Sequence, residues 1–323
     1  MMLLVLAHIF LALVLFRLVN WLGEHATDFG YASTTLFEEP TESLALNFLI
    51  RALAPSVYLV ALGASAVASG FPELRIGVYW IAIYYYCIRG AYIFAVNMQL
   101  LVNWYRFFRH TVVGLLAAWL AYEALILPNR SLLPDLDAAG NELWLAIIAF
   151  LYAASNRVTV SDGGGARRRN AFVKASFDRA KKSFGELIDG QIADERVKLM
   201  AYSILVYEDY CRPPTVRLLE RLIFWREQVT TGVMQVSSRA RLTDAESVQL
   251  GVKKLSESWL HHSEKEPYLR VKETIADYNR DDEYVWKVLD VMELVAKRAA
   301  PEFWAVYNGL YEDNTTVDGG ASE

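Results

Sequence analysis

Long apolar stretches in the first half of the chain constrain its fold more than any other feature. They cover residues 2–22, 46–70, 76–101, 111–127 and 143–154. A helix needs about 20 predominantly apolar residues to cross the hydrocarbon core of a bilayer. The first four stretches reach or approach that length, and the fifth reaches it only with the addition of residues 155–160. We therefore predict a transmembrane region of about five helices over residues 1–155.

Four charged residues interrupt these apolar stretches, and we expect the side chains of two of them, Arg17 and Arg51, to reach the membrane interface. Arg89 stands within IAIYYYCIRGAYIFAV, and Glu123 is the acid that the sequence offers as its partner. A charge inside a bilayer is costly and by default indicates pairing or function. We expect Arg89 and Glu123 to form a structural pair between helices. A pore and a ligand site are the alternatives.

The composition changes after Ala154. Residues 156–169 read as a basic, Gly-rich linker, and from about residue 170 the chain is charged and helix-periodic. The following helices are predicted: residues 170–187, 194–211, 215–228, 243–261, 265–278, 281–297 and 301–311. Residues 170–311 have the length of a domain, and residues 312–323 predict a disordered tail. The predicted fold class is all-α, with a multi-span N-terminal region and a helical C-terminal domain.

The composition and the motif content exclude several functions. The net charge of −5 argues against nucleic-acid binding. The chain has no P-loop and no GxSxG, and the adjacent His261 and His262 lack the further ligands that a zinc site needs. With two cysteines in the whole chain, a disulfide framework is not expected. We predict no metal and no cofactor.

A candidate general acid stands at the end of an apolar run. Residues 202–207 lead into Glu208 and Asp209, and a Pro-Pro pair then ends the helix. Apolar neighbours raise the pKa of a carboxyl group and so prepare it to donate a proton. The alternative is that Glu208 is a helix-end acid paired with Arg212, four residues on. We interpret Asp209 as a surface or capping acid.

Two further motifs follow Glu208. They are GVMQ at residues 232–235 and ADYN at residues 276–279. In this order the three elements resemble those of the lysozyme-like lytic transglycosylases, which are related to goose-type lysozyme. That family has a catalytic Glu at the end of an apolar helix, then a Gly-apolar-Met-Gln motif, then Ala-Tyr-Asn. The resemblance covers residues 195–300 and predicts a lysozyme-like catalytic domain over residues 170–311.

The chain departs from the family pattern in several places. Asp209 replaces the usual Ser, and Asp277 separates the Ala and Tyr of the third motif. The gap between Glu208 and Gly232 is longer than expected. A second Tyr-Asn-Gly at residues 307–309 competes for the third motif. We prefer residues 278–279 because Tyr284 and Val288 follow there at the family's spacing.

The resemblance implies an enzyme that cleaves peptidoglycan, and the predicted spans would anchor it in a membrane. Glu208 would protonate the leaving oxygen of the MurNAc-GlcNAc bond and then accept a proton from the sugar's own C6 hydroxyl. The implied substrate-binding residues are Gly232, Met234, Gln235, Tyr278 and Asn279. Met234 and Tyr278 have core positions as their alternative interpretation. The expected partners are the lipid bilayer and peptidoglycan glycan strands, and a homo-oligomer is compatible with the sequence.

The predicted spans and the resemblance together imply a location. The spans predict a multi-pass protein of a bacterial inner membrane, and a peptidoglycan-cleaving domain would have to be periplasmic. The positive-inside rule indicates the opposite, because five spans put Arg106, Arg109 and Arg157 on the same side as the domain. Without the fifth span the two indications agree. The alternative function is a membrane sensor or channel whose lysozyme-like domain only binds a ligand or glycan. Arg89 and Asp209 favour that alternative.

Overall fold

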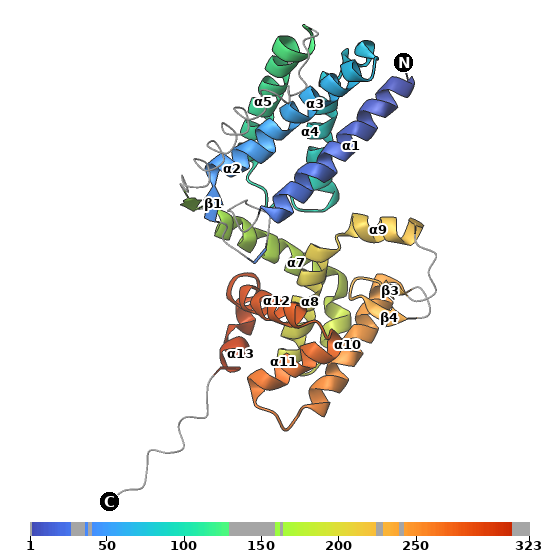
Figure 1. Cartoon of the computed structure of the whole chain (residues 1–323). Helices are drawn as coiled ribbons and strands as arrows, with labels where there is room; N and C mark the ends of the chain where they lie inside the picture. Colours follow the sequence, from blue (N-terminus) through green and yellow to red (C-terminus); the bar gives the residue numbers. More distant parts are fainter. Residues whose placement is uncertain are drawn as a thin grey trace, which may run out of the picture. The chain divides into compact units, whose positions relative to one another are not determined.

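The structure is a computed structural model that describes residues 2–26, 36–37, 41–128, 159–161, 164–223, 229–238 and 242–311. Over this part the chain is helical apart from two short antiparallel strand pairs, so the predicted all-α class is confirmed. The chain divides into two compact units (Figure 1). Unit 1 comprises Met1–Phe94 and Leu101–Gly165, and unit 2 comprises Ala95–Leu100 and Ala166–Glu323.

Unit 1 is a bundle of long helices. Its elements are α1 (Met2–His25), α2 (Leu44–Phe48), η2 (Leu49–Leu53), α3 (Ala54–Ala68), η3 (Pro72–Arg75), α4 (Tyr79–Ala95), α5 (Trp104–Ala121) and η4 (Tyr122–Ile126). Strands β1 (Thr41–Ser43) and β2 (Thr159–Ser161) pair antiparallel. The helices fall on the first four predicted spans. The fifth, residues 143–154, lies outside the described residues.

Two helical segments of unit 1, Leu4–His25 and Leu46–Ala68, are long and apolar enough to cross a membrane. The predicted number of about five spans is not confirmed. Helix α4 has 17 residues, or about 26 Å, which is short of the roughly 30 Å of a hydrocarbon core. Helix α5 carries Arg106, Arg109 and His110 in its first half.

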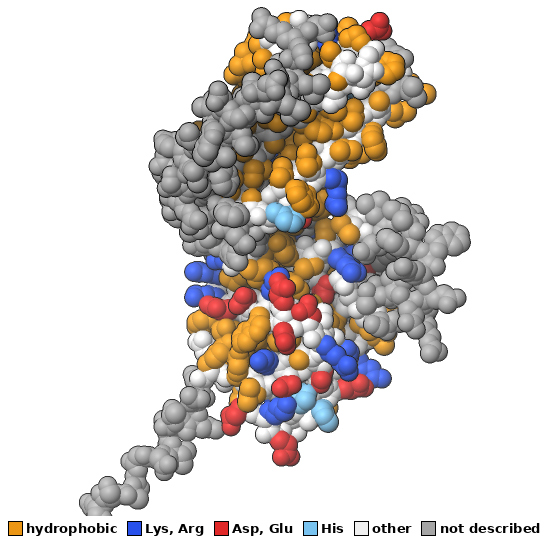
Figure 2. All heavy atoms as spheres, in the orientation of Figure 1, with side chains coloured by type: hydrophobic (Ala, Val, Ile, Leu, Met, Phe, Trp, Pro, Cys, Tyr) orange, Lys and Arg blue, Asp and Glu red, His pale blue; other side chains and the backbone are white. Residues whose placement is uncertain are grey.

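The inner faces of these helices form an apolar core. Leu15 of α1, Leu59 of α3 and Tyr85 of α4 are fully buried in it, as is Ala118 of α5. The outer faces are also apolar, as Figure 2 shows over the described helices of the unit. The exposed large side chains include Phe10, Trp21, Val57, Trp80, Phe94, Phe108 and Trp119. An exposed apolar surface of this extent is typical of a region that contacts a membrane or another protein.

Helices α4 and α5 run antiparallel, and this separates Arg89 from Glu123. The Gly77 amide, just before α4, donates to the Tyr122 hydroxyl at 3.2 Å. Arg89 comes ten residues after the start of α4, and its guanidinium lies 5.8 Å from the centre of the Phe107 ring. Glu123 therefore lies near the start of α4 and Arg89 near its end, about 15 Å apart along the axis. The predicted ion pair between them is wrong.

Unit 2 is a helical domain. Its elements are α7 (Gly165–Gln191), α8 (Glu195–Cys211), α9 (Pro214–Ile223), β3 (Val229–Thr231), β4 (Val236–Ser238), α10 (Asp244–His261), α11 (Pro267–Tyr278), α12 (Asp282–Leu294), η5 (Val295–Ala299), η6 (Pro301–Phe303) and α13 (Trp304–Asn308). The seven predicted helices are all present, with shifted ends. The residues of the predicted tail, 312–323, lie outside the described part of the chain.

Local sequence determines most of these boundaries. Thr243 and Glu246 form the predicted capping box at the start of α10. Asp194 and Asp281 cap α8 and α12 through their side chains. One boundary was predicted wrongly: α7 begins at Gly165, so Arg167–Arg169 are helical and not part of the linker. Alanine and arginine are strong helix formers, and they extend the helix towards its N-terminus.

Helix α8 is the centre of unit 2. Its residues from Leu199 to Asp209 are all buried, which is typical of a helix surrounded by others. Helices α10, α11, α12 and α13 all contact it. A side chain at the end of α8 therefore lies against several other elements of the domain.

Candidate functional site

Glu208 lies in the last turn of α8, and its side chain is held by two other elements. The residue is 4% exposed. The Tyr284 hydroxyl, from the first turn of α12, donates to Oε1 at 3.0 Å. Gln235, from the turn between β3 and β4, donates to Oε2 through Nε2. Both carboxylate oxygens thus accept hydrogen bonds from neutral side chains.

The surroundings of Glu208 favour its protonated form. Burial raises the pKa of Glu208 to about 7, against the hydrogen bond from Tyr284 and the charges of Arg212 and Arg217, which lower it. In the alternative interpretation Glu208 pairs with Arg212, and Arg212 is close enough for its charge to lower the pKa of Glu208. Arg212 acts on Glu208 through its charge, while Tyr284 and Gln235 make the hydrogen bonds. A carboxyl group with this pKa exchanges a proton readily near neutral pH.

The turn between β3 and β4 has a conformation that its sequence makes possible. Gly232 has φ +76°, and a Cβ there would lie 2.1 Å from Cβ of Ser247, so only glycine fits. Gln235 has φ +47°, which is uncommon for a residue with a side chain. The Met234 amide donates to the Ser247 hydroxyl at 2.9 Å. These contacts fix the turn on α10 and direct Gln235 at Glu208.

Met234 does not contribute its side chain to a binding surface. The side chain is fully buried, and a Cβ on Gly251 of α10 would lie 2.8 Å from its sulfur. The core interpretation of Met234 is therefore correct, and its predicted contact with substrate is wrong. An apolar side chain inside a short turn is drawn to the nearest core, which α10 provides.

Tyr278 and Asn279 support the site from the end of α11. The Tyr278 hydroxyl donates to the carbonyl oxygen of Met234, and its ring stacks on Tyr284 with the centres 6.5 Å apart. Asn279 Oδ1 accepts from the amide of Asp281 at 3.1 Å and so turns the chain into α12. Tyr278 thus supports Glu208 indirectly, because it contacts Met234, next to Gln235, and Tyr284. Asn279 orders the loop before Tyr284.

Tyr284 supports the choice of the third motif by its spacing, but it is not among the predicted site residues. It is buried, and its ring also packs edge-on against Tyr207, with the centres 5.1 Å apart. Its signals in the sequence are its spacing after the third motif and an aromatic residue with a polar tip in the first turn of a predicted helix. Neither signal says which helix the hydroxyl faces. The competing Tyr307 instead shares a hydrogen bond with Tyr311.

Asp209 faces away from this site. It is 8% exposed, and its Oδ2 accepts from Ser176 at 3.1 Å and from Arg179 at 2.5 Å, both on α7. The prediction of a surface or capping acid is wrong. Successive helix residues point about 100° apart, so Glu208 and Asp209 face different neighbours. Asp209 joins α8 to α7.

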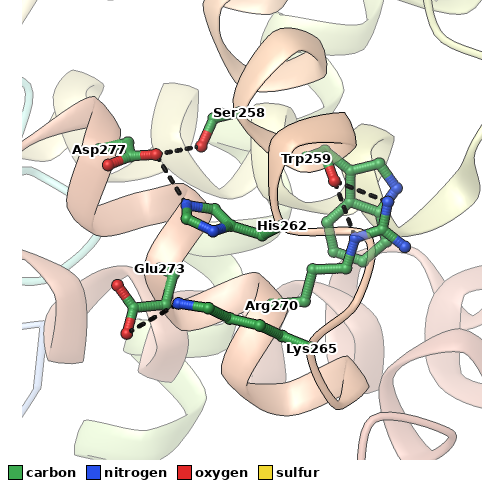
Figure 3. Close-up of polar contacts among 7 residues, drawn as sticks. All are labelled: Ser258, Trp259, His262, Lys265, Arg270, Glu273 and Asp277. Carbon is green, nitrogen blue, oxygen red and sulfur yellow. Dashed lines mark hydrogen bonds and ion pairs between the residues drawn. The ribbon is translucent and has the colours of Figure 1, made fainter.

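Asp277, which interrupts the third motif, joins α11 to α10 (Figure 3). Its Oδ2 accepts from the Ser258 hydroxyl at 2.6 Å and from His262 Nε2 at 2.9 Å. The acid lies between the serine and the histidine, whereas nucleophile activation needs the histidine in the middle. The contacts are therefore structural. In the part of the chain that the structure describes, no three His, Cys, Asp or Glu side chains gather as metal ligands do.

Comparison with known proteins does not assign the chain to a family. No protein-family model matches it, and neither do the curated proteins or the solved structures searched. The function has to be argued from the geometry around Glu208.

Proposed function

We propose that this protein cleaves peptidoglycan glycan strands in the manner of a lytic transglycosylase, with Glu208 as its single catalytic carboxyl group. The observation that carries the proposal is the buried Glu208 carboxyl, held by Tyr284 and Gln235 and with a pKa of about 7. Its neighbours belong to the second and third motifs or follow them closely. The motif order in the sequence supports the same class.

In the proposed reaction, protonated Glu208 donates its proton to the glycosidic oxygen as that bond breaks. Oxocarbenium character develops on the sugar at the same time. The carboxylate left behind then accepts the proton of the sugar's C6 hydroxyl, whose oxygen attacks C1. The product carries a 1,6-anhydro ring, no water is consumed, and Glu208 ends protonated again. A pKa near the working pH suits both steps.

The surrounding residues have separate roles in this mechanism. Tyr284 and Gln235 hold the carboxylate in place and stabilise it when it is ionised. The glycine at residue 232 lets the turn that carries Gln235 pack against Ser247 of α10. Tyr278 fixes the turn that carries Gln235, and Asn279 orders the chain before Tyr284. Binding of the sugar by Gly232, Gln235 and Asn279 is part of the proposal.

The position of Asp209 favours a one-carboxylate mechanism. Two-carboxylate glycosidases place the second group about 5 to 9.5 Å from the first, on the other side of the substrate. Asp209 is the adjacent acid, and Arg179 and Ser176 of α7 hold it away from Glu208. We therefore expect anhydro ends rather than reducing ends.

We place the protein in a bacterial inner membrane, with unit 1 as a multi-pass anchor and unit 2 in the periplasm, where peptidoglycan lies. The two segments with spanning length and the exposed apolar faces of α4 and α5 support a membrane anchor of more than one helix. In this proposal the protein interacts with the lipid bilayer and with peptidoglycan glycan strands.

The test is cleavage of purified peptidoglycan by the full chain in detergent micelles, with and without Glu208→Gln. The substitution keeps the size of the side chain and removes the transferable proton, so release of muropeptides should fall about a hundredfold to ten-thousandfold. The matched control is Glu283→Gln, the same change in an exposed acid that pairs with Lys287 at 2.5 Å. Mass spectrometry of the products distinguishes anhydro from reducing ends.

Equal cleavage by wild type and Glu208→Gln would show that the catalytic assignment is wrong. If neither protein cleaves and both bind glycan strands, unit 2 is a binding domain and the sensor or channel alternative replaces the enzyme.

A further inference from the structure

Four arginines of unit 1 gather around one buried histidine. They are Arg51 in η2, Arg89 in α4, and Arg106 and Arg109 in α5, and the charges of all four act on the imidazole of His110. His110 is 7% exposed. Its Nδ1 atom is buried without a hydrogen-bond partner among the described residues.

Close helix packing brings these residues together. His110, Gly114 and Ala118 form the buried face of α5, at a spacing of four residues. A Cβ on Gly114 would lie 3.1 Å from the carbonyl oxygen of Ala52, so the glycine lets α5 pack directly on η2, next to Arg51. Segment η2 is a single π-helical turn, a feature that is frequent at functional sites.

Helix α4 closes the cluster from another side. The Tyr86 hydroxyl donates to the carbonyl oxygen of Arg51 at 3.1 Å, which ties α4 to η2. Arg89 follows within one turn and donates to the Tyr85 hydroxyl at 3.4 Å. Its guanidinium also lies over the ring of Phe107 in α5. Three helical elements thus carry arginines whose charges act on the same histidine.

The described contacts of Arg89 and Arg109 are with neutral groups. Arg89 contacts a hydroxyl and a ring, and Arg109 lies 5.9 Å from the centre of the Tyr105 ring. Like charges held close together in a partly buried place repel one another, and an anion between them relieves that repulsion. Planar guanidinium groups bind phosphate oxygens through paired N–H donors, which makes phosphate the best match.

The position in the bundle indicates where the phosphate comes from. The cluster lies where α4 ends and α5 begins, at the opposite end of α4 from Glu123. Aromatic residues gather at the same end: Phe94 packs against Trp104 with the ring centres 5.4 Å apart, and Tyr105 is exposed. Belts of aromatic residues with arginines mark the headgroup level of membrane proteins.

We propose that Arg51, Arg89, Arg106 and Arg109, together with His110, form a binding site for the phosphate group of an anionic phospholipid. The lipid holds the start of α5 to η2 and α4. The site is separate from Glu208 and does not depend on the enzymatic proposal.

The experiment measures binding of short-chain phosphatidylglycerol to the delipidated full chain in neutral detergent, by native mass spectrometry. Parallel arms use phosphatidylcholine, which has the phosphate without net charge, and inorganic phosphate. Arg106→Gln with Arg109→Gln should weaken phosphatidylglycerol binding about tenfold or more for each charge-assisted hydrogen bond removed. The matched control is Arg17→Gln, an exposed arginine of α1 outside the cluster, which should bind as wild type does.

Arg109→Gln alone serves if the double variant does not fold, because Arg109 is exposed and its loss leaves the core intact. Equal binding of the two lipids, equal binding by wild type and the folded cluster variant, or equal weakening by Arg17→Gln would overturn the proposal. Saturation by inorganic phosphate with no binding of phosphatidylglycerol would overturn the lipid as the source of the phosphate.

Discussion

For Glu208, the proposed activity and the stability of the fold are in conflict. Burial that raises the pKa of a carboxyl group also makes its ionised form unfavourable in the folded protein. Tyr284 and Gln235 offset part of this cost by hydrogen bonding to the two oxygens. Single substitutions at these residues can therefore change the rate of cleavage and the free energy of unfolding in different directions.

Tyr284→Phe tests the hydrogen bond to the ionised carboxyl group. Because the Tyr284 hydroxyl lowers the pKa of Glu208, its removal should raise that pKa. Cleavage needs Glu208 protonated at the start, so the fall in kcat/KM at high pH should move to higher pH. The maximal rate should fall about tenfold or more, since a hydrogen bond to a charge is lost. The measurement is a pH–rate profile on peptidoglycan.

Tyr278→Phe is the control for this profile, because the Tyr278 hydroxyl donates to a backbone carbonyl and not to Glu208. It should change the rate more than the pH dependence. An unchanged profile for Tyr284→Phe would contradict the assigned hydrogen bond.

Glu208→Gln should stabilise the protein above pH 7. The folded pKa lies above the unfolded value, so the folded state binds more protons and stability falls as the pH rises from 4.5 to about 7. This rise in pKa corresponds to a loss of about 3 kcal/mol that is complete above pH 7 and absent below 4.5. Glutamine does not ionise and avoids the loss.

Chemical unfolding of wild type and Glu208→Gln at pH 8 and at pH 4.5 measures this effect. The variant should be more stable at pH 8, and the gain should be much smaller at pH 4.5. A gain that is equal at both pH values would rule out the ionisation of Glu208 as its cause.

Among the elements, α7 and α8 are joined by a buried acid and a partly exposed base. Breaking a buried ion pair is costly because the remaining charge is left desolvated. Arg179 is about half exposed, so water screens part of the interaction with Asp209. The contact connects α7 to Asp209, the residue next to Glu208.

Arg179→Gln should lower the free energy of unfolding by about 1 to 2 kcal/mol, after allowance for the exposure of Arg179. Lys181→Gln on the same helix is the matched control, because Lys181 pairs with Glu302 at the surface, and its loss should cost less than about 0.5 kcal/mol. Urea titration of both variants gives the comparison. Equal losses would mean that Asp209 does not depend on Arg179.

The turn between β3 and β4 gives a second test at this scale. Gly232→Ala places a methyl group against Ser247 in a backbone conformation that alanine rarely adopts, so the turn has to shift. Gln235 moves with it, and peptidoglycan cleavage should fall about a hundredfold. In contrast, Gly190→Ala in α7 meets no neighbour within 4 Å and should stabilise the protein by about 0.5 to 1 kcal/mol. Full activity in Gly232→Ala would remove the turn from the site.

The whole molecule combines an apolar unit with a charged one (Figure 2). Unit 1 exposes large apolar side chains on α1, α4 and α5, while ion pairs such as Lys198–Glu195 and Lys287–Glu283 lie on the surface of unit 2. This division matches a bilayer around the first unit and water around the second.

An alkaline phosphatase fusion after Tyr311 should be active. Alkaline phosphatase folds to its active form only in the periplasm, and the proposed substrate of unit 2, peptidoglycan, lies there. A green fluorescent protein fusion at the same residue is the complementary control and should stay dark. A fluorescent fusion with an inactive phosphatase would place unit 2 in the cytoplasm. Cleavage of peptidoglycan in place would then be excluded as the function.

The sequence by itself determined the features that depend on nearby residues. Apolar periodicity predicted the helices, and Thr243 with Glu246 predicted the start of α10. The apolar run before Glu208, ended by two prolines, predicted a carboxyl group buried at the end of a helix. These features follow from backbone geometry and from contacts within a few residues, so they can be read along the chain.

The tertiary structure alone decided which side chains from separate elements meet. Tyr284 lies on Glu208, Asp209 pairs with Arg179, and the arginine at residue 89 lies far from its expected acid. The apolar face of one helix can pack against any of several other helices, and the sequence does not say which of them it contacts. That choice depends on the directions in which whole helices pack, and these directions come from the complete core rather than from any single segment.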